Sequence, residues 1–254
     1  MTDALYLADL GADPAPGDLI EVTGDEGRHA AVVKRTRVGE MLLVADGAGR
    51  AICGQVIEAS KQSVVVRVDG VLAAPQHRHR WTAVQALAKG DRSEIAVESL
   101  TELGVDRVVA WQASRCVVRW DARPGIPDKS AKGVAKWQAV ARAATKQSRR
   151  FRVPAVEYAS TDNVVALILD ASLALVAHEE ATVPLAAVEL PADGEVVVII
   201  GPEGGISPDE LQAFEEAGAK LVSLGDGVLR TSSAGVVSLA QLQVLAAQQG
   251  IQGP

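Results

Sequence analysis

Residues 195–239 read EVVVIIGPEGGISPDELQAFEEAGAKLVSLGDGVLRTSSAGVVSL, and this stretch decides the fold class that the sequence predicts. Its first part, Val196–Ile200, is a short β-branched run that is typical of a strand buried on both faces. The proline and glycines of residues 201–205 end this strand, because proline lacks a backbone donor and glycine adopts backbone angles that are closed to other residues. Ser207 is then expected to cap a helix, with the carboxylate of Glu210 reaching back to the Ser207 amide. The stretch therefore predicts a strand, a glycine loop and a helix in direct succession.

A second glycine loop follows in the same order. Residues 220–224 form a short candidate strand, residues 225–227 read Gly-Asp-Gly and predict a turn, and Arg230 precedes a candidate helix. No charged residue follows Arg230, yet serines and glutamines recur through Thr231–Pro254 and make a membrane span costly. We expect this tail to be a helix that is buried in a core or in a subunit interface.

Strands and helices alternate through the preceding part of the chain. The strands are expected at residues 81–87, 107–111 and 173–177, and the helices at 92–103 and 129–148. Such alternation predicts an α/β fold with a mostly parallel sheet and helices on both faces. Ligands of these sheets bind at the carboxyl ends of the strands. Three loops are expected to meet there, at residues 177–179, 201–205 and 225–230.

The N-terminal part has a different pattern, with short strands separated by turns. The strands are expected at residues 18–22, 41–45, 50–58 and 63–68, and one helix is expected at 25–36. Many short strands with a single helix indicate a small β-barrel. A polar, turn-like segment near residues 72–79 then predicts two domains, 1–73 and 74–254.

Charge is unevenly distributed along the 254 residues. The net charge is −7, but residues 128–152 carry eight Lys or Arg against one acid, so this segment has a charge of +7 and the remainder −14. A basic face on an acidic protein suggests a polyanion that docks at one place. The alternative is a helix face that is merely solvated.

Metal and disulfide chemistry are not supported by the sequence. Cys53 and Cys116 lie far apart without CxxC spacing, and His77 and His79 alternate in HRHRW, which we interpret as a solvated entrance to a strand. The N-terminus lacks the basic and long apolar regions of a signal peptide. A reduced cytoplasmic protein without a metal fits these features.

The first glycine loop matches neither of two familiar nucleotide-binding motifs. GPEGGIS lacks the Lys-Ser/Thr pair of a phosphate-binding P-loop, and it is not the GxGxxG of dinucleotide sites. A glycine turn after a buried strand is often only structural. Three loops at strand ends of one sheet, with the isolated Arg230 before an uncharged helix, favour instead a site for an anion or a polar base edge.

Several motifs extend this interpretation over nearly the whole chain. They are RHAAVVKRTRVGEMLLVADGAGR, KGDRSEIAVESLTELGV, SRCVV, KWQAVARAATKQSRRFRVP, IIGPEGGISPDE and LGDGVLRTSSA. Through them the sequence resembles the RsmE family of 16S rRNA uracil-N3 methyltransferases. That family belongs to the SPOUT, or trefoil-knotted, class and uses S-adenosylmethionine.

The resemblance implies roles for both domains. Residues 1–73 would form a PUA-like barrel that binds RNA, and residues 74–254 a knotted domain that binds S-adenosylmethionine and forms a homodimer. The substrate would be uracil 1498 of 16S rRNA in the assembled 30S subunit. The expected cofactor-binding residues are Ala177, His178, Ile200, Gly201, Pro202, Glu203, Gly204, Gly205, Leu224, Gly225, Val228, Leu229, Thr231 and Ala234.

Arg230 is the candidate catalytic residue. Uracil N3 carries a proton at neutral pH, and no histidine or acid in the motifs is an obvious base for it. Arg230 could hold the uracil oxygens and favour the deprotonated ring. The target base is expected to leave its stack, while basic residues bind phosphates. Those residues are Arg28, Lys34, Arg35, Lys146, Arg149, Arg150 and Arg152.

Two departures and three alternatives accompany the resemblance. Ser232 stands where family members commonly have a glutamate, so any role of that acid is missing here, and Lys146 replaces a frequent acid. A related knotted enzyme could instead methylate a ribose or another base. The chain could also be a non-catalytic RNA-binding or ribosome-assembly factor. A nicotinamide oxidoreductase is disfavoured, because the chain has no dinucleotide fingerprint.

Overall fold

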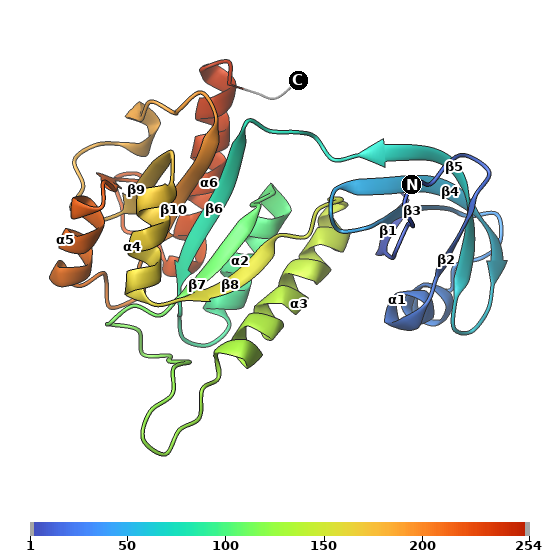
Figure 1. Ribbon diagram of the computed structural model, residues 1–254, viewed down its shortest axis with the longest axis horizontal. Helices are drawn as coiled ribbons and strands as arrows, with labels where there is room; N and C mark the ends of the chain where they lie inside the picture. The colour runs from blue at the N-terminus through green and yellow to red at the C-terminus, as the bar shows by residue number, and fades with distance from the viewer. Residues whose placement is uncertain (1–2, 252–254) are drawn as a thin grey trace. The chain divides into compact units, whose positions relative to one another are not determined.

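The structure is a computed structural model that describes residues 3–251, and its chain separates into two compact units (Figure 1). Of the described residues, unit 1 comprises 3–75 and 142–153, and unit 2 comprises 76–141 and 154–251. The basic segment 142–153 therefore belongs to the same compact unit as the N-terminal part of the chain.

Unit 1 is built on a five-stranded sheet with the order β1-β3-β4-β5-β2. Strands β1 and β3 pair in parallel, and the other neighbours are antiparallel. Its core holds Tyr6, Val44, Ile52 and Val66. The predicted helix at 25–36 is a short α-helix that continues into a π-helical turn. The bounds are β1 Ala4–Leu7, β2 Leu19–Val22, α1 Gly24–Arg28, η1 His29–Val33, β3 Met41–Ala45, β4 Arg50–Ala59 and β5 Val64–Ala73.

Unit 2 is built on a six-stranded, fully parallel sheet with the order β11-β9-β10-β6-β7-β8. Helices lie on both faces of this sheet (Figure 1), as the alternating pattern predicts. The strands are β6 His79–Ala86, β7 Arg107–Trp111, β8 Ala155–Ala159, β9 Leu173–Ala177, β10 Gly194–Ile200 and β11 Lys220–Val222. The helices are α2 Arg92–Leu103, α4 Thr161–Asp170, η2 Leu185–Ala187, α5 Pro208–Glu216 and α6 Thr231–Gln248. Helix α3, Ser130–Ser148, begins in unit 2, and its residues from 142 onward belong to unit 1.

Helix α6 is a core helix, which confirms one of the two expectations for the uncharged tail. Its Leu239 and Leu242 are almost fully buried in the core of unit 2. The side chain of Gln243 donates to the carbonyl oxygen of Leu103 at the end of α2, at 2.9 Å. No helix within residues 3–251 is long and apolar enough to cross a membrane. The last predicted residues of the tail, 252–254, lie outside the described part of the chain.

One histidine differs from its prediction. The sequence suggests a solvated strand entrance at His77 and His79, but His79 lies inside β6 and is only 3% exposed. Its Nε2 is 2.8 Å from the carbonyl oxygen of Pro191, and its ring packs against Trp81. The distant segment around Pro191 covers the strand end, and nothing in the local HRHRW pattern indicates this.

Candidate functional site

The loops that follow β9, β10 and β11 all leave the sheet of unit 2 at its carboxyl edge, because these three strands end in register. Ala177, the last residue of β9, lies in register with Ile200 of β10 and with Val222 of β11. The three strands are adjacent and parallel, so the loops after them emerge side by side at the carboxyl edge (Figure 1). The backbone N–H of His178 donates to the carbonyl oxygen of Val222 at 3.0 Å and fastens two of the loops together. The predicted meeting of the loops is confirmed.

The first loop, residues 201–205, is held from two sides. Glu203 Oε1 accepts hydrogen bonds from the backbone N–H of Lys89 and from the guanidinium of Arg92, each at 3.1 Å. Partial burial opposes ionisation of Glu203, but these bonds and one from its own backbone N–H hold its pKa below the usual value. On the other side, Arg115 donates to the carbonyl oxygens of Gly204 and Ile206 at 3.3 Å. The protein itself therefore sets the shape of this loop.

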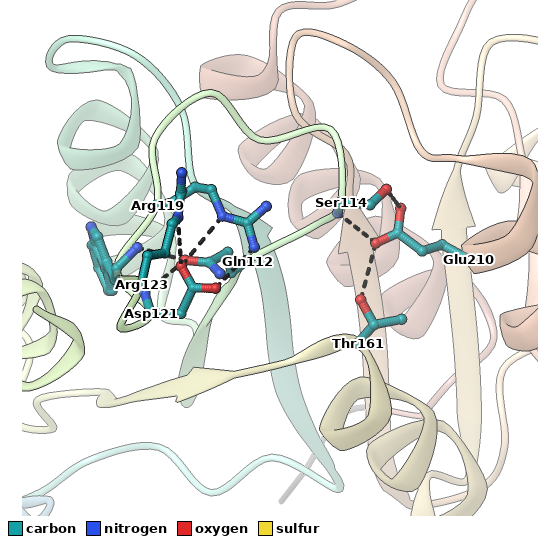
Figure 2. A network of polar contacts seen from close by, with 8 residues as sticks. Gln112, Ser114, Arg119, Asp121, Arg123, Thr161 and Glu210 are labelled. Carbon is teal, nitrogen blue, oxygen red and sulfur yellow. Dashed lines mark hydrogen bonds and ion pairs between the residues drawn. The ribbon is translucent and has the colours of Figure 1, made fainter. Parts of the chain in front are cut away.

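Glu210 ties the helix after the first loop to two other segments. Its carboxylate accepts from Ser207 at the start of α5, as the sequence predicts, with the N–H to Oε2 distance at 3.1 Å. It also accepts from the backbone N–H and the hydroxyl of Ser114 at 2.7 and 2.8 Å, and from the Thr161 hydroxyl at 3.0 Å (Figure 2). Burial opposes ionisation, but these bonds lower the pKa of Glu210. No pattern in the sequence indicates Ser114 or Thr161 as its partners.

The second loop, residues 225–230, is open by contrast. All six of its residues are exposed, with Val228 at 77% and Leu229 at 39%. The backbone N–H groups of residues 225–229 donate to no other described residue. Exposed apolar side chains beside free amide donors form an incomplete surface, which a bound molecule or another chain could complete.

The start of α6 joins the second loop to the first. The Thr231 hydroxyl donates to the carbonyl oxygen of Gly201 at 2.8 Å and accepts from Nε2 of Gln85 at 2.9 Å. Thr231 and Ala234 are only 6% and 7% exposed, so these two expected cofactor residues lie beneath the loops. The other expected residues divide by exposure. Ile200 and Pro202 are buried, Ala177, His178, Gly201 and Leu224 are half-buried, and Glu203, Gly204, Gly205, Gly225, Val228 and Leu229 are exposed.

Arg230 is the N-cap residue of α6 and is exposed. Its carbonyl oxygen accepts from the backbone N–H of Ser233 and of Ala234 at 2.9 Å. Its guanidinium makes no hydrogen bond or ion pair with any residue in the described part of the chain. A cation without an internal partner, at the edge where three loops meet, is available to an external anion or polar ring.

All seven predicted RNA-binding residues belong to unit 1. Five of them, Arg28, Lys34, Arg35, Arg149 and Arg152, are exposed. Lys146 is different, because its Nζ lies 2.8 Å from Oε1 of Glu26, a carboxylate that Arg142 also approaches at 3.9 Å. Lys146 is therefore already paired with a carboxylate inside unit 1, unlike a lysine that is open to phosphate.

Two of these arginines have a left-handed backbone, with φ of 55° at Arg35 and 56° at Arg149. They are the two non-glycine residues with positive φ in the described chain. Arg149 follows the end of α3, where the backbone N–H of Arg150 donates to the carbonyl oxygen of Thr145 at 3.0 Å. Glycine usually occupies this position of a helix end, because a side chain costs about 1–2 kcal/mol there.

Comparisons with known proteins agree with this architecture. Residues 75–243 match the RNA methyltransferase domain family, and residues 22–69 match the RNA methyltransferase PUA domain family. These matches confirm the prediction of a SPOUT-type parallel α/β domain with a smaller PUA-like domain.

Individual relatives extend over nearly the whole chain. Ribosomal RNA small subunit methyltransferase E of Mycobacterium bovis is 44% identical over 91% of this chain and 88% of its own. A Legionella pneumophila protein solved with the cofactor SAM bound is 27% identical, with a TM-score of 0.82 over 98% of both chains. Ribosomal RNA small subunit methyltransferase E of Neisseria gonorrhoeae, solved with S-adenosyl methionine, has the same fold, with 24% identity and a TM-score of 0.81 over 96% and 98%. The chain belongs to the RsmE family of ribosomal RNA small subunit methyltransferases.

Proposed function

We propose that this protein transfers a methyl group from S-adenosylmethionine to N3 of uracil 1498 in 16S rRNA, within the assembled 30S subunit. It would act in the cytoplasm as a homodimer, with the second loop and α6 at the subunit contact. The family name of the Mycobacterium bovis relative supports an rRNA substrate, and the bound cofactor of the Legionella pneumophila relative supports the methyl donor.

The proposal rests mainly on the observation that β9, β10 and β11 end in register with one another. It gathers the loops 177–179, 201–205 and 225–230 at one edge of a parallel sheet, the usual ligand-binding edge of such folds. The residues fit the cofactor chemically. Gly204 and Gly205 leave exposed backbone without side chains, Val228 and Leu229 offer apolar surface, and the N–H groups of residues 225–229 can donate to ring nitrogens.

Bound S-adenosylmethionine would supply an electrophilic methyl group that needs a nucleophile but no metal. Arg230 provides the complementary part of the chemistry. Its guanidinium can donate a hydrogen bond to a uracil oxygen beside N3 and stabilise the negative charge that develops as N3 loses its proton. Arg230 thus orients the base and lowers the free energy of its reactive form.

His178, in the loop after β9, does not take the proton in this proposal. His178 Nδ1 accepts a hydrogen bond from the backbone N–H of Glu180 at 3.2 Å, so this nitrogen is occupied. Neither Glu203 nor Glu210 serves, because each carboxylate is already bonded to several donors. Stabilisation of the deprotonated uracil by Arg230 lets water accept the proton.

Unit 1 supplies the RNA-binding surface in this proposal. Its exposed cations, Arg28, Lys34, Arg35, Arg149 and Arg152, would bind phosphates, which positions the subunit without reading sequence. Charge reversal at Arg149 should weaken binding and reduce the dependence of affinity on salt concentration. An unchanged salt dependence would assign this segment to a solvated helix face.

The decisive experiment is methyl transfer from labelled S-adenosylmethionine to 30S particles that lack the modification, followed by mapping of the methylated nucleotide. Label at N3 of uracil 1498 supports the proposal, and label on a ribose or another base identifies a different knotted methyltransferase. Cofactor binding without transfer to any rRNA identifies a non-catalytic factor. Sedimentation of the purified protein tests the homodimer, which a monomer would contradict.

A further inference from the structure

A polar pocket of about 360 Å³ opens beyond the carboxyl ends of β7 and β8, among residues that the proposed reaction does not use. It lies on the segment after β7 and on the first residues of α4, all within unit 2. A volume above about 300 Å³ is in the range of sites that hold small organic ligands. The lining residues are Gln112, Ser114, Arg119, Asp121, Tyr158, Ser160, Thr161 and Asp162.

One wall of the pocket is fixed by an ion pair and a carboxamide. Arg119 donates to both oxygens of Asp121, at 3.3 and 2.9 Å, and Arg123 approaches the same carboxylate at 3.6 Å (Figure 2). Gln112 is only 8% exposed, and its Oε1 accepts from the backbone N–H of Trp120 and of Asp121. This wall is therefore held in place before any ligand arrives.

The pocket favours hydrogen-bond donors over anions. Asp121, Asp162 and the nearby Asp128 face two cations, Arg119 and Arg123, which leaves an excess of negative charge. The hydrogen bond from Arg119 lowers the pKa of Asp121 to about 2, so this carboxylate is ionised at neutral pH. The exposed Asp162 carboxylate bonds to no other described residue. A phosphate would be repelled here, whereas N–H and amino groups would be accepted.

An aromatic side chain adds a flat surface. Tyr158 lines the pocket, and its ring centroid lies 6.1 Å from that of Trp120 at an interplanar angle of 30°. Burial and the charges of Asp121 and Asp128 raise the pKa of Tyr158, so its hydroxyl stays protonated. Unpaired RNA bases are recognised by such a combination, in which the ring stacks on an aromatic side chain and its edge bonds to polar groups.

We propose that this pocket binds an unstacked guanine of the RNA substrate, next to the base that is methylated. Guanine is the base that presents two neighbouring N–H donors, at N1 and N2, and a carboxylate such as that of Asp162 can accept both. The inference rests on the proposed function, because it takes RNA as the substrate and adds a second recognised nucleotide.

The position of the pocket supports a link with methyl transfer. Ser114 and Thr161 line the pocket, and both donate to Glu210, which also caps the helix after the first glycine loop. The pocket and the cofactor loop therefore share one buried carboxylate. A guanine in the pocket would be recognised by elements that are rigidly joined to the proposed cofactor site.

The test compares free guanosine with inosine, which lacks the N2 amino group, by saturation-transfer NMR and titration of the whole protein. Wild-type protein should bind guanosine at least fivefold more tightly than inosine, with uridine weaker still. Asp162→Asn should reduce this preference to less than twofold. The matched control, Asp170→Asn, alters another exposed aspartate of α4 and should leave the preference unchanged. Tyr158→Ala should weaken both nucleosides, whereas Tyr158→Phe keeps the ring and most of the affinity.

Equal binding of guanosine and inosine by wild-type protein would overturn the inference, as would an unchanged preference in Asp162→Asn. Methyl transfer by the same preparations separates this outcome from failure of the proposed function. Transfer to rRNA without a guanosine preference removes the pocket assignment alone. A guanosine preference without any transfer leaves the pocket standing and removes the methyltransferase proposal. In an active protein, Asp162→Asn should raise the KM for RNA and leave the cofactor Kd unchanged.

Discussion

The two glycine loops of unit 2 lie side by side, yet the protein holds them in opposite ways. The first, residues 201–205, is fixed by Lys89, Arg92 and Arg115 and is followed by a helix that Glu210 anchors. The second, residues 225–230, is exposed throughout, and its amides from 225 to 229 donate to no other described residue. Glycines in both loops therefore do not imply that both loops are held equally firmly by the rest of the protein.

The difference suggests that the two loops have different roles at the proposed site. A loop that the protein shapes in advance can bind a cofactor without a large ordering cost, since its conformational entropy is already lost. A loop without internal partners gains its contacts from what binds to it, here the cofactor, the substrate or a second subunit. Substitutions in the first loop should therefore affect stability and binding together, and those in the second should affect function alone.

The largest effect is expected at the end of the open loop, for Arg230→Ala. Loss of the guanidinium removes a charge-stabilising donor, so methyl transfer should fall by at least about 100-fold. The cofactor Kd and the melting temperature should change little, because the side chain has no internal partner. Single-turnover methylation and cofactor titration measure these quantities. Arg230→Lys, which keeps the charge but not the planar fork, should retain intermediate activity. A large loss of cofactor affinity would instead make Arg230 a cofactor ligand.

The second-largest effect is expected for Glu210→Gln, which changes the carboxylate that holds the helix after the first loop. The backbone N–H of Ser114 donates to Oε1, and that of Ser207 donates to Oε2. Whichever way the glutamine amide turns, its NH₂ faces one of these donors, so the free energy of unfolding should fall by about 2–3 kcal/mol. Urea denaturation measures the change. Glu215→Gln, the same change at an exposed position of this helix, is a control that should change stability by less than about 0.5 kcal/mol.

The same substitution has a pH dependence. The folded pKa of Glu210 is lowered, so its ionised form contributes stability that is fully present above the ordinary carboxyl pKa of about 4.3. That contribution is lost as the pH falls through the lowered folded value. The difference in unfolding free energy between wild type and Glu210→Gln should therefore shrink in acid. A constant difference between pH 7 and pH 3 would contradict the assignment.

A smaller effect compares one glycine from each loop. A Cβ at Gly204 would lie 3.3 Å from both Cβ and the carbonyl oxygen of Arg115, whereas a Cβ at Gly227 would meet nothing within 4 Å. Gly204→Val should lower stability by about 1–2 kcal/mol and reduce cofactor affinity at least about tenfold. Gly227→Val, the matched steric control in the second loop, should leave stability unchanged. Normal cofactor binding by Gly204→Val would remove the first loop from the cofactor site.

The smallest change in stability is expected for Val228→Ser. Val228 is 77% exposed, so the free energy of unfolding should stay within about 0.5 kcal/mol of wild type. Cofactor affinity should nevertheless fall about threefold or more, since an apolar contact to the bound ring is lost. Calorimetric titration beside thermal unfolding checks both quantities. Clear destabilisation would show that the second loop belongs to the core and would end the contrast between the loops.

The sequence predicts well what is local in the chain. The strand at Val196–Ile200, the capping box of Ser207 and Glu210, and the buried helix after Arg230 all appear as expected, because each depends on residues within one or two turns. The adjacency of the three loops also follows from local patterns, since parallel strands all end at one edge. These features gave both the fold class and the position of the candidate site.

Contacts between distant residues could not be predicted in this way. Glu210 meets Ser114 across 96 residues and Thr161 across 49, and no periodicity records such partners. Strand β8 and helix α4 were not predicted either. Helix α4 has a local signal, because Ser160 and Asn163 form a capping box at its start. The exposure of Val228 and the burial of Thr231 depend on how α6 packs, which the uncharged sequence leaves open.

The left-handed backbone at Arg35 and Arg149 has a consequence for engineering. A laboratory selection for heat resistance alone would enrich glycine at both positions, because glycine adopts positive φ without steric cost. Under the proposed function the same replacements would remove two cations from the RNA-binding surface. A selection for ribosome modification would restore arginine. The two selections would therefore rank the same variants in opposite order. A protein selected only for thermal stability would have a lower affinity for the ribosomal subunit.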